Sequence, residues 1–351
     1  MKHKTFLVSL LAAILLISCA PIKPYQDVRF KDVRIHGELG DSVIQTLWFN
    51  KSTTWSKQDT SVAEDILKLG MDPGLGIRAL HDQGITGKGV NVAIIDQNMI
   101  LDHPEIRGKI VKYHDVGTKT ASDEGSMHGP AVTSLLVGEN IGTAPEASVY
   151  YAAAPSWKAD AQYYADALNW IIEENEKLPE DGKIRVVSVS AAPSGEGSPF
   201  TKNNGAWDAA YQRAKDAGIL VIDATIEHRV TSPCYLDLHD PDNIEKCIPG
   251  WPEDEKYQLK GDYIHVPAAR RTTAEEYDQG KFSYQYDGQG GYSWSMPYLA
   301  GVLAMGWQVN PDLTGEELLD MALASAYIAD GNAKVINPQA FIEMVKLSLN
   351  E

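Results

Sequence analysis

Short apolar runs alternate with helical patterns from about residue 75 to the C-terminal end. The runs are brief and aliphatic, and they lack the apolar–polar alternation of a strand that has one face in water. Strands buried on both faces have this pattern. The predicted strands are residues 90–95, 148–153, 184–189 and 218–224. Between them, helical spacing of apolar residues predicts helices over residues 130–137, 161–177 and 206–216.

This alternation of strands and helices predicts an α/β fold, with a mainly parallel sheet flanked by helices on both faces. Active sites in such sheets lie beyond the carboxyl ends of the strands. Polar residues that directly follow the apolar runs are therefore the first candidates for chemistry. We assign residues 75–351 to this domain and treat the polar, irregular residues 19–74 as an N-terminal extension: a tether, a cap or a pro-segment.

The N-terminus has the organisation of a signal peptide, residues 1–18. Lys2 and Lys4 precede an apolar run over residues 6–17 that is too short to span a bilayer as a mature helix. The run ends at Cys19 in a segment that resembles the bacterial lipobox, which implies diacylation of Cys19. Two acyl chains suffice for stable attachment. We expect a lipid-anchored, extracytoplasmic protein of the bacterial cell envelope; the alternative is an ordinary cleaved signal with an incidental cysteine.

The net negative charge of the chain limits the classes of binding partner. Removal of residues 1–18 takes away two lysines and no acid, so the formal net charge goes from −17 to −19. Such an acidic chain disfavours nucleic acid and anionic lipid surfaces as partners. The membrane is expected as a partner only through the lipid on Cys19.

Two further cysteines, Cys234 and Cys247, lie in one loop. In an oxidising compartment such a pair suggests a disulfide, which would contribute about 3 kcal/mol in the chain-entropy model. Two free thiols are the alternative. No metal site is predicted, because the nearby histidines lack ligand spacing.

Three residues at the predicted strand ends and turns are candidates for catalysis. Asp96 follows the strand at 90–95, His128 precedes an apolar helix, and Ser293 follows two glycines at the start of another helix. Each alone has an ordinary explanation: a turn aspartate, a loop histidine and a helix-capping serine. A serine at a helix N-terminus would also gain from the helix dipole, which favours a developing oxyanion there.

Taken together, these segments resemble the subtilisin-like serine peptidases over roughly residues 75–345. The order Asp, His, Ser is that of subtilisin and differs from the order in chymotrypsin or the α/β-hydrolases. The resemblance rests on residues 86–96 with His103-Pro104, on His128-Gly129 with Ala144-Pro145, and on Ser293 with Pro297, Ala300 and Gly301.

The resemblance implies a three-layer fold and a serine endopeptidase that hydrolyses peptide bonds through an acyl-enzyme on Ser293. His128 would be the base and Asp96 its orienting partner. Ser295 is a rival nucleophile, but the spacing to Pro297 and Gly301 favours Ser293.

The sequence departs from the family pattern at several positions. Gln97 and Asn98 follow Asp96, Pro130 follows His128-Gly129, and Trp294 stands where the family has methionine after the serine. The largest departure is Glu227, which occupies the position of the family's oxyanion-hole asparagine.

An ionised Glu227 has no proton to donate to an oxyanion. Loss of one such donor typically lowers the rate by about 10²–10³. Three interpretations follow: a protonated Glu227 donates; Thr225 or His228 donates instead; or catalysis is weak and the protein binds peptide or protein. We favour an active site in which the loss is compensated.

A peptide substrate is expected to pair with strand edges. The resemblance points to Ser190, Ala191 and Ala192 as one edge and to residues 153–157 as a second. No cofactor is expected; calcium, which the resemblance allows, is an unsupported alternative, because no calcium-binding loop with ligand spacing is present. A serine esterase is a weaker alternative, because no Gly-x-Ser-x-Gly elbow surrounds Ser293.

Overall fold

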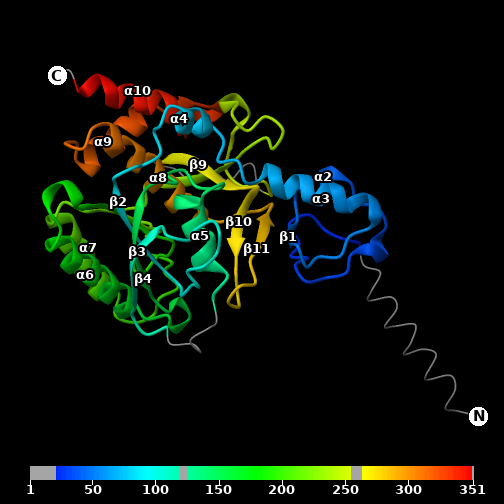
Figure 1. The fold of residues 1–351 in the computed structure, drawn as a ribbon, viewed down its shortest axis with the longest axis horizontal. Helices are drawn as coiled ribbons and strands as arrows, with labels where there is room; N and C mark the ends of the chain where they lie inside the picture. Colours follow the sequence, from blue (N-terminus) through cyan, green and yellow to red (C-terminus); the bar gives the residue numbers. More distant parts are fainter. Residues whose placement is uncertain (1–20, 119–124, 254–262, 350–351) are drawn as a thin grey trace, which may run out of the picture.

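The computed structural model describes residues 21–118, 125–253 and 263–349. Its central layer is a five-stranded sheet in which every pairing is parallel, with the order β3-β4-β2-β5-β6. Helices cover both faces of this sheet (Figure 1). The strands are β2 (Asn91–Asp96), β3 (Ile110–Asp115), β4 (Ser148–Ala153), β5 (Ile184–Val189) and β6 (Leu220–Ile222).

The predicted α/β class and all four predicted strands are confirmed. The predicted helices also form, although their ends differ by a few residues. They are α5 (His128–Val137), α6 (Gln162–Glu176) and α7 (Asn204–Asp216). A further long helix, α8 (Tyr292–Val309), follows later in the chain.

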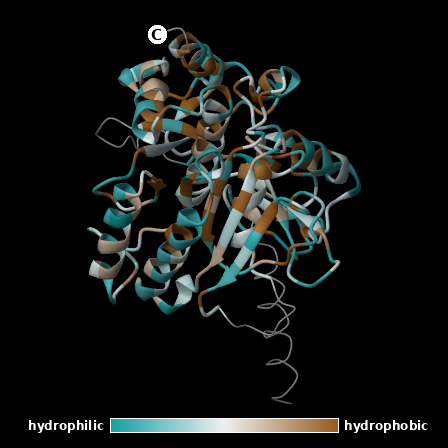
Figure 2. Ribbon diagram, turned by 60° about the vertical axis from the view of Figure 1, so that its left-hand side comes forward, coloured by the Kyte–Doolittle hydropathy of each residue, from teal (hydrophilic) through white to brown (hydrophobic). Residues whose placement is uncertain are grey.

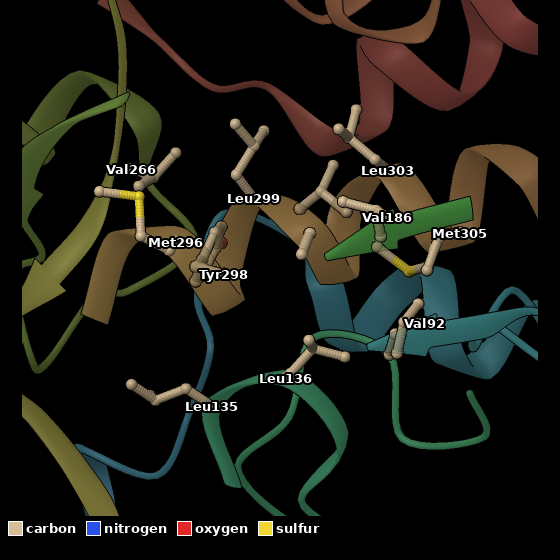
Figure 3. Packing of buried hydrophobic residues seen from close by; sticks show 14 of the residues in the cluster. Val92, Leu135, Leu136, Val186, Val266, Met296, Tyr298, Leu299, Leu303 and Met305 are labelled. Carbon is tan, nitrogen blue, oxygen red and sulfur yellow. The ribbon is translucent and has the colours of Figure 1, made fainter. Parts of the chain in front are cut away.

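Strand β2 shows why the runs lack alternation. Val92 and Ile94 join the apolar cluster that includes α5 and α8, while Ala93 and Ile95 join the cluster that includes α6 and α7. Successive side chains point to opposite faces, and both faces are buried. Figure 3 shows the first cluster, in which Val92 and Val186 of the sheet lie near side chains of α8.

Two smaller sheets complete the fold. One has the order β12-β13-β9-β7-β8 and the other the order β1-β11-β10. The pattern of apolar residues predicts none of these strands. Their bounds are β1 (Trp48–Asn50), β7 (Thr231–Tyr235), β8 (Ile248–Pro249), β9 (Ile264–Ala269), β10 (Arg271–Glu275), β11 (Ser283–Asp287), β12 (Tyr327–Ile328) and β13 (Lys334–Val335).

The remaining helices lie at the periphery, together with short 3-10 turns. Figure 2 shows the hydrophobic residues concentrated in the interior strands and helices, whereas the outer helices mix hydrophilic and hydrophobic turns. The peripheral α-helices are α2 (Asp41–Ile44), α3 (Lys57–Leu69), α4 (Ile77–Asp82), α9 (Gly315–Ala324) and α10 (Pro338–Ser348).

The N-terminal extension, from Pro21 onward, is folded against the domain. Strand β1 pairs antiparallel with β11, and Val28, Ile44 and Phe49 pack with Tyr286 in a separate apolar cluster. The described part of this extension is therefore packed against the domain and is not a loose tether, although its sequence is irregular and polar.

Residues 1–20, including Cys19, lie outside the described residues. The signal peptide and the lipid anchor therefore stay predictions. Among the residues that the structure does describe, none of the helices is both long and apolar enough to cross a membrane.

Candidate active site

Asp96 and His128 form a tight pair at the carboxyl end of β2. Asp96 is 2% exposed, and its Oδ1 accepts a hydrogen bond from the Gln97 N–H at 2.7 Å. The same oxygen lies 2.7 Å from Nδ1 of His128. A carboxylate only accepts hydrogen bonds, so Nδ1 carries the proton and Nε2 is left free to act as a base.

The residue after His128 must be small. A Cβ on Gly129 would lie 2.6 Å from the carbonyl oxygen of Gln97 and 2.7 Å from the hydroxyl of Tyr151. The absence of a side chain lets α5 begin directly against the loop that follows Asp96.

Burial lowers the pKa of His128, but the nearby charge of Asp96 and its hydrogen bond outweigh that effect. The net result is a pKa raised above the usual value for histidine. The pair therefore stabilises the protonated imidazole of His128.

Ser293 lies in the first turn of α8, where backbone N–H groups have no partners within the helix. The turn before it needs a glycine: Gly290 has φ +74°, and a Cβ there would lie 1.8 Å from the carbonyl oxygen of Ala268. This close approach sets where α8 begins and directs the first turn, with its partial positive charge, toward the site.

A proline frees the carbonyl group of the serine. Within a helix the Ser293 carbonyl would accept from the N–H four residues later, but that residue is Pro297, which has none. The hydroxyl of Ser190 donates to this carbonyl instead, at 2.8 Å. In return, the Ser293 hydroxyl donates to the Ser190 carbonyl at 3.4 Å. Ser190, from the segment after β5, thus contacts both the carbonyl group and the hydroxyl group of Ser293.

Trp294, the residue after the serine, packs on the base. Its ring centroid lies 5.4 Å from that of His128, and the planes are inclined by 28°. Its indole N–H donates to Oδ2 of Asp287 at 3.3 Å. Through this contact, α8 brings the Ser293 segment next to the Asp96–His128 pair.

Ser295 cannot serve as the nucleophile in this geometry. It is fully buried, its hydroxyl donates to the Tyr292 carbonyl at 2.7 Å, and it lies 3.0 Å from the hydroxyl of Thr231. The preference for Ser293 over Ser295 therefore agrees with their burial.

Glu227 lies in the turn after β6 and is exposed. Its Oε1 accepts a hydrogen bond from the Glu196 N–H at 2.9 Å, and its other oxygen lies close to Gly195. This exposed position differs from the partly buried site that the donor role of Glu227 assumes. The oxyanion role of Glu227 stays a prediction, without support from this contact.

The two alternative donors are both engaged by Asp223, a buried residue. Thr225 donates to Asp223 from its N–H at 3.1 Å and from its hydroxyl at 2.9 Å. Nδ1 of His228 lies 3.0 Å from Asp223, and its ring stacks on Tyr211 at 4.0 Å. Neither side chain is therefore free to turn toward Ser293 without leaving Asp223.

The predicted substrate edge Ser190-Ala191-Ala192 directly follows β5 and is half-buried. The Ala191 carbonyl already accepts from the Ala224 N–H at 2.9 Å. The second edge was predicted to run through residue 157, but Ser156–Lys158 is a 3-10 helix, so that prediction is wrong beyond residue 155. A chain coiled at this point cannot pair as a strand.

Cys234 and Cys247 are both buried, on β7 and directly before β8. Their sulfur atoms lie 2.6 Å apart, and the structure records both thiols as free. The sequence placed the two correctly beside each other; the disulfide itself stays a prediction.

Within the described ranges, no group of three or more His, Cys, Asp or Glu side chains could hold a metal ion.

The site joins a serine at a helix N-terminus to a buried Asp–His pair at the carboxyl edge of a parallel sheet, which is the arrangement of a serine hydrolase. The model of the Subtilase family matches residues 87–276 of the chain. The chain belongs to this family. The match contains Asp96 and His128, whereas Ser293 lies beyond it and is brought to the site by the fold.

Curated relatives agree with this assignment. The chain is 22% identical to the subtilisin-like protease PopC of Myxococcus xanthus, over 72% of this chain and 58% of that protein. It is 25% identical to the serine protease AprX of Bacillus subtilis, over 69% and 62%. The chain thus spans about three-fifths of the length of these relatives.

Solved structures show the same fold. The prenylagaramide maturation protease PagA aligns with a TM-score of 0.54 at 16% identity, over 77% of this chain and 98% of that one. Fervidolysin from Fervidobacterium pennivorans aligns with a TM-score of 0.56 at 12% identity, over 78% and 45%.

Proposed function

We propose that the protein is a serine endopeptidase that cleaves peptide bonds through an acyl-enzyme on Ser293. The observation that carries this proposal is the buried Asp96–His128 pair at 2.7 Å, packed against the residue that adjoins Ser293. Family membership supports the same reaction class. Peptides or proteins are accordingly the proposed substrates.

The mechanism begins with a rotation. The Ser293 hydroxyl donates to the Ser190 carbonyl and must turn about its Cα–Cβ bond toward His128 before it reacts. His128 then takes the hydroxyl proton on Nε2 while the oxygen attacks the substrate carbonyl carbon. The negative charge of Asp96 stabilises the imidazolium that forms.

The tetrahedral intermediate then collapses. The bond to the leaving amine breaks, and His128 returns its proton to that nitrogen. Water repeats the sequence on the ester and releases the acid from Ser293. The N–H of Ser293, in the first turn of α8, is the proposed donor to the oxyanion, since it lies at the positive end of the helix dipole. The Trp294 N–H already donates to the Gly291 carbonyl at 3.0 Å.

We further propose that the protein acts at the bacterial cell envelope, held by a lipid on Cys19. The charged and apolar segments of residues 1–18 and the lipobox-like sequence support this location. Incorporation of an alkyne-tagged fatty acid in cells should be lost in Cys19→Ser. Retained incorporation in that variant would refute lipidation at this residue.

A fluorophosphonate probe tests the enzymatic proposal directly. The full chain, purified in detergent, should be labelled at Ser293, and the label should disappear in Ser293→Ala and in His128→Ala. Ser295→Ala is the matched control, because the buried Ser295 should not react, and labelling should persist. Absence of label over a broad pH range would refute the enzyme and favour the alternative, a lipoprotein that binds peptide with a weak site.

A further inference from the structure

The aromatic ring beside the base has no part in the reaction as described above. Trp294 is 4% exposed and stacks on the His128 imidazole, with centroids 5.4 Å apart. A cation within about 6 Å of an indole face is attracted to the ring, and the attraction grows when water is excluded. The neutral imidazole gains much less, so the contact favours the protonated base.

The orientation of the indole is fixed from its other edge. Asp287, at the end of β11, accepts the indole N–H on Oδ2, while its Oδ1 accepts the N–H groups of Gln289 at 3.1 Å and Gly290 at 2.9 Å. Burial raises the pKa of Asp287, and these three donors oppose that effect. When ionised, a carboxylate on the indole N–H increases the electron density of the ring and strengthens its hold on a cation.

We propose that Trp294 is a positioning residue that holds the His128 imidazole against Asp96 and stabilises its protonated form during acyl transfer. The inference rests on the proposed peptidase function. It assigns to Trp294, the third residue of α8, a role next to that of the proposed nucleophile, because one helix carries both Ser293 and the ring. Displacement of either one would move the other.

Other charged groups around α5 do not compete for this role. Asp96 on β2 is the group whose charge acts directly on His128. On β10, which also packs against α5, Arg271 points to the Gly70 and Ile141 carbonyls, and Glu275 accepts from Asn50.

Tyr151 of β4 donates to the Gln97 carbonyl, and burial raises its pKa well above the ordinary value, so it stays neutral. The pH behaviour of His128 therefore depends on Asp96 and on the ring, whose hold on a cation depends in turn on Asp287.

The test is the pH profile of fluorophosphonate labelling at Ser293 in wild type, Trp294→Phe and Trp294→Leu. Labelling requires neutral His128, so the rate falls as pH drops through its pKa. Both variants keep water out, but only phenylalanine keeps a π face. We expect the acid limb to move to lower pH by about half a unit in Trp294→Leu and less in Trp294→Phe, with rates at the plateau lower by about three- to tenfold in the leucine variant.

A merely structural role would lower the plateau without moving the limb. An unchanged limb in Trp294→Leu, or a limb that moves to higher pH, would overturn the proposal. If Trp294→Leu fails to fold, Trp294→Met, whose longer side chain also lacks a π face, decides by the same comparison. Direct titration of the His128 imidazole by NMR in Ser293→Ala, with and without the Trp294→Phe change, gives an independent measure. Failure of the wild type to label at any pH would instead refute the peptidase function itself.

Discussion

The contact between Ser190 and Ser293 gives the sharpest test of how the proposed nucleophile is held. Substitution of Ser190 by alanine removes the hydroxyl that donates to the Ser293 carbonyl at 2.8 Å. No backbone N–H in the helix can replace it, because the residue four positions later is Pro297. The carbonyl is then left without its donor in a half-buried site.

The structure sets the expected size of the effect. A typical intramolecular hydrogen bond contributes about 1 kcal/mol net, and a buried acceptor left without a partner costs about 1–3 kcal/mol. We therefore expect Ser190→Ala to lower the free energy of unfolding by about 1–2 kcal/mol. In the Ser190→Ala/Pro297→Ala double variant, the new N–H of alanine can bond to the Ser293 carbonyl and recover about 1 kcal/mol of that loss.

The assay is a double-mutant cycle, with urea denaturation of the wild type, Ser190→Ala, Pro297→Ala and the double variant. Pro297→Ala also removes buried ring atoms, and the cycle subtracts this cost because it occurs in both backgrounds. Labelling of Ser293 in each variant reports whether the lost contact also misplaces the nucleophile. Additivity within about 0.3 kcal/mol would refute the idea that the proline creates the need for Ser190.

Three further predictions follow from other parts of the structure. Burial and the charge of Asp102 raise the pKa of Glu276 to about 7, so the folded protein keeps a proton that the unfolded chain loses near pH 4.5. The free energy of unfolding should therefore fall as pH rises between these two values, and Glu276→Gln should recover about 2 kcal/mol at pH 8 in urea denaturation. An equal gain at pH 4 would contradict this cause. Cys234 and Cys247 should resist alkylation in oxidised, denatured protein and react after reduction, as read by mass spectrometry, and prompt alkylation before reduction would show two free thiols. Gly290→Ala forces a Cβ into a backbone carbonyl at a positive φ. We expect this variant to destabilise the fold by more than about 1 kcal/mol and to abolish labelling of Ser293. Wild-type stability and labelling in Gly290→Ala would be evidence against this explanation.

Much of the architecture follows from periodicity. The four central strands and three helices were predicted to within a few residues, because a segment buried on both faces must be apolar throughout. The strands that were missed have a different origin. Strand β10, Arg271–Glu275, is polar in sequence yet fully buried, since its side chains find partners such as the Leu67 carbonyl for Thr272 and Asn50 for Glu275. Such partners lie some 200 positions away and leave no local pattern.

The sequence by itself identified the candidate groups for the reaction. Asp96, His128 and Ser293 each follow a strand or precede a helix, and their order and neighbouring small residues specify the class of site. Only the tertiary structure decided how these groups are held: that Trp294 stacks on the base and that Ser190 bonds to the nucleophile's carbonyl. The reason is physical, because burial and chain direction are encoded locally, whereas a contact between side chains depends on the register of strands and the rotation of helices that only the complete fold sets.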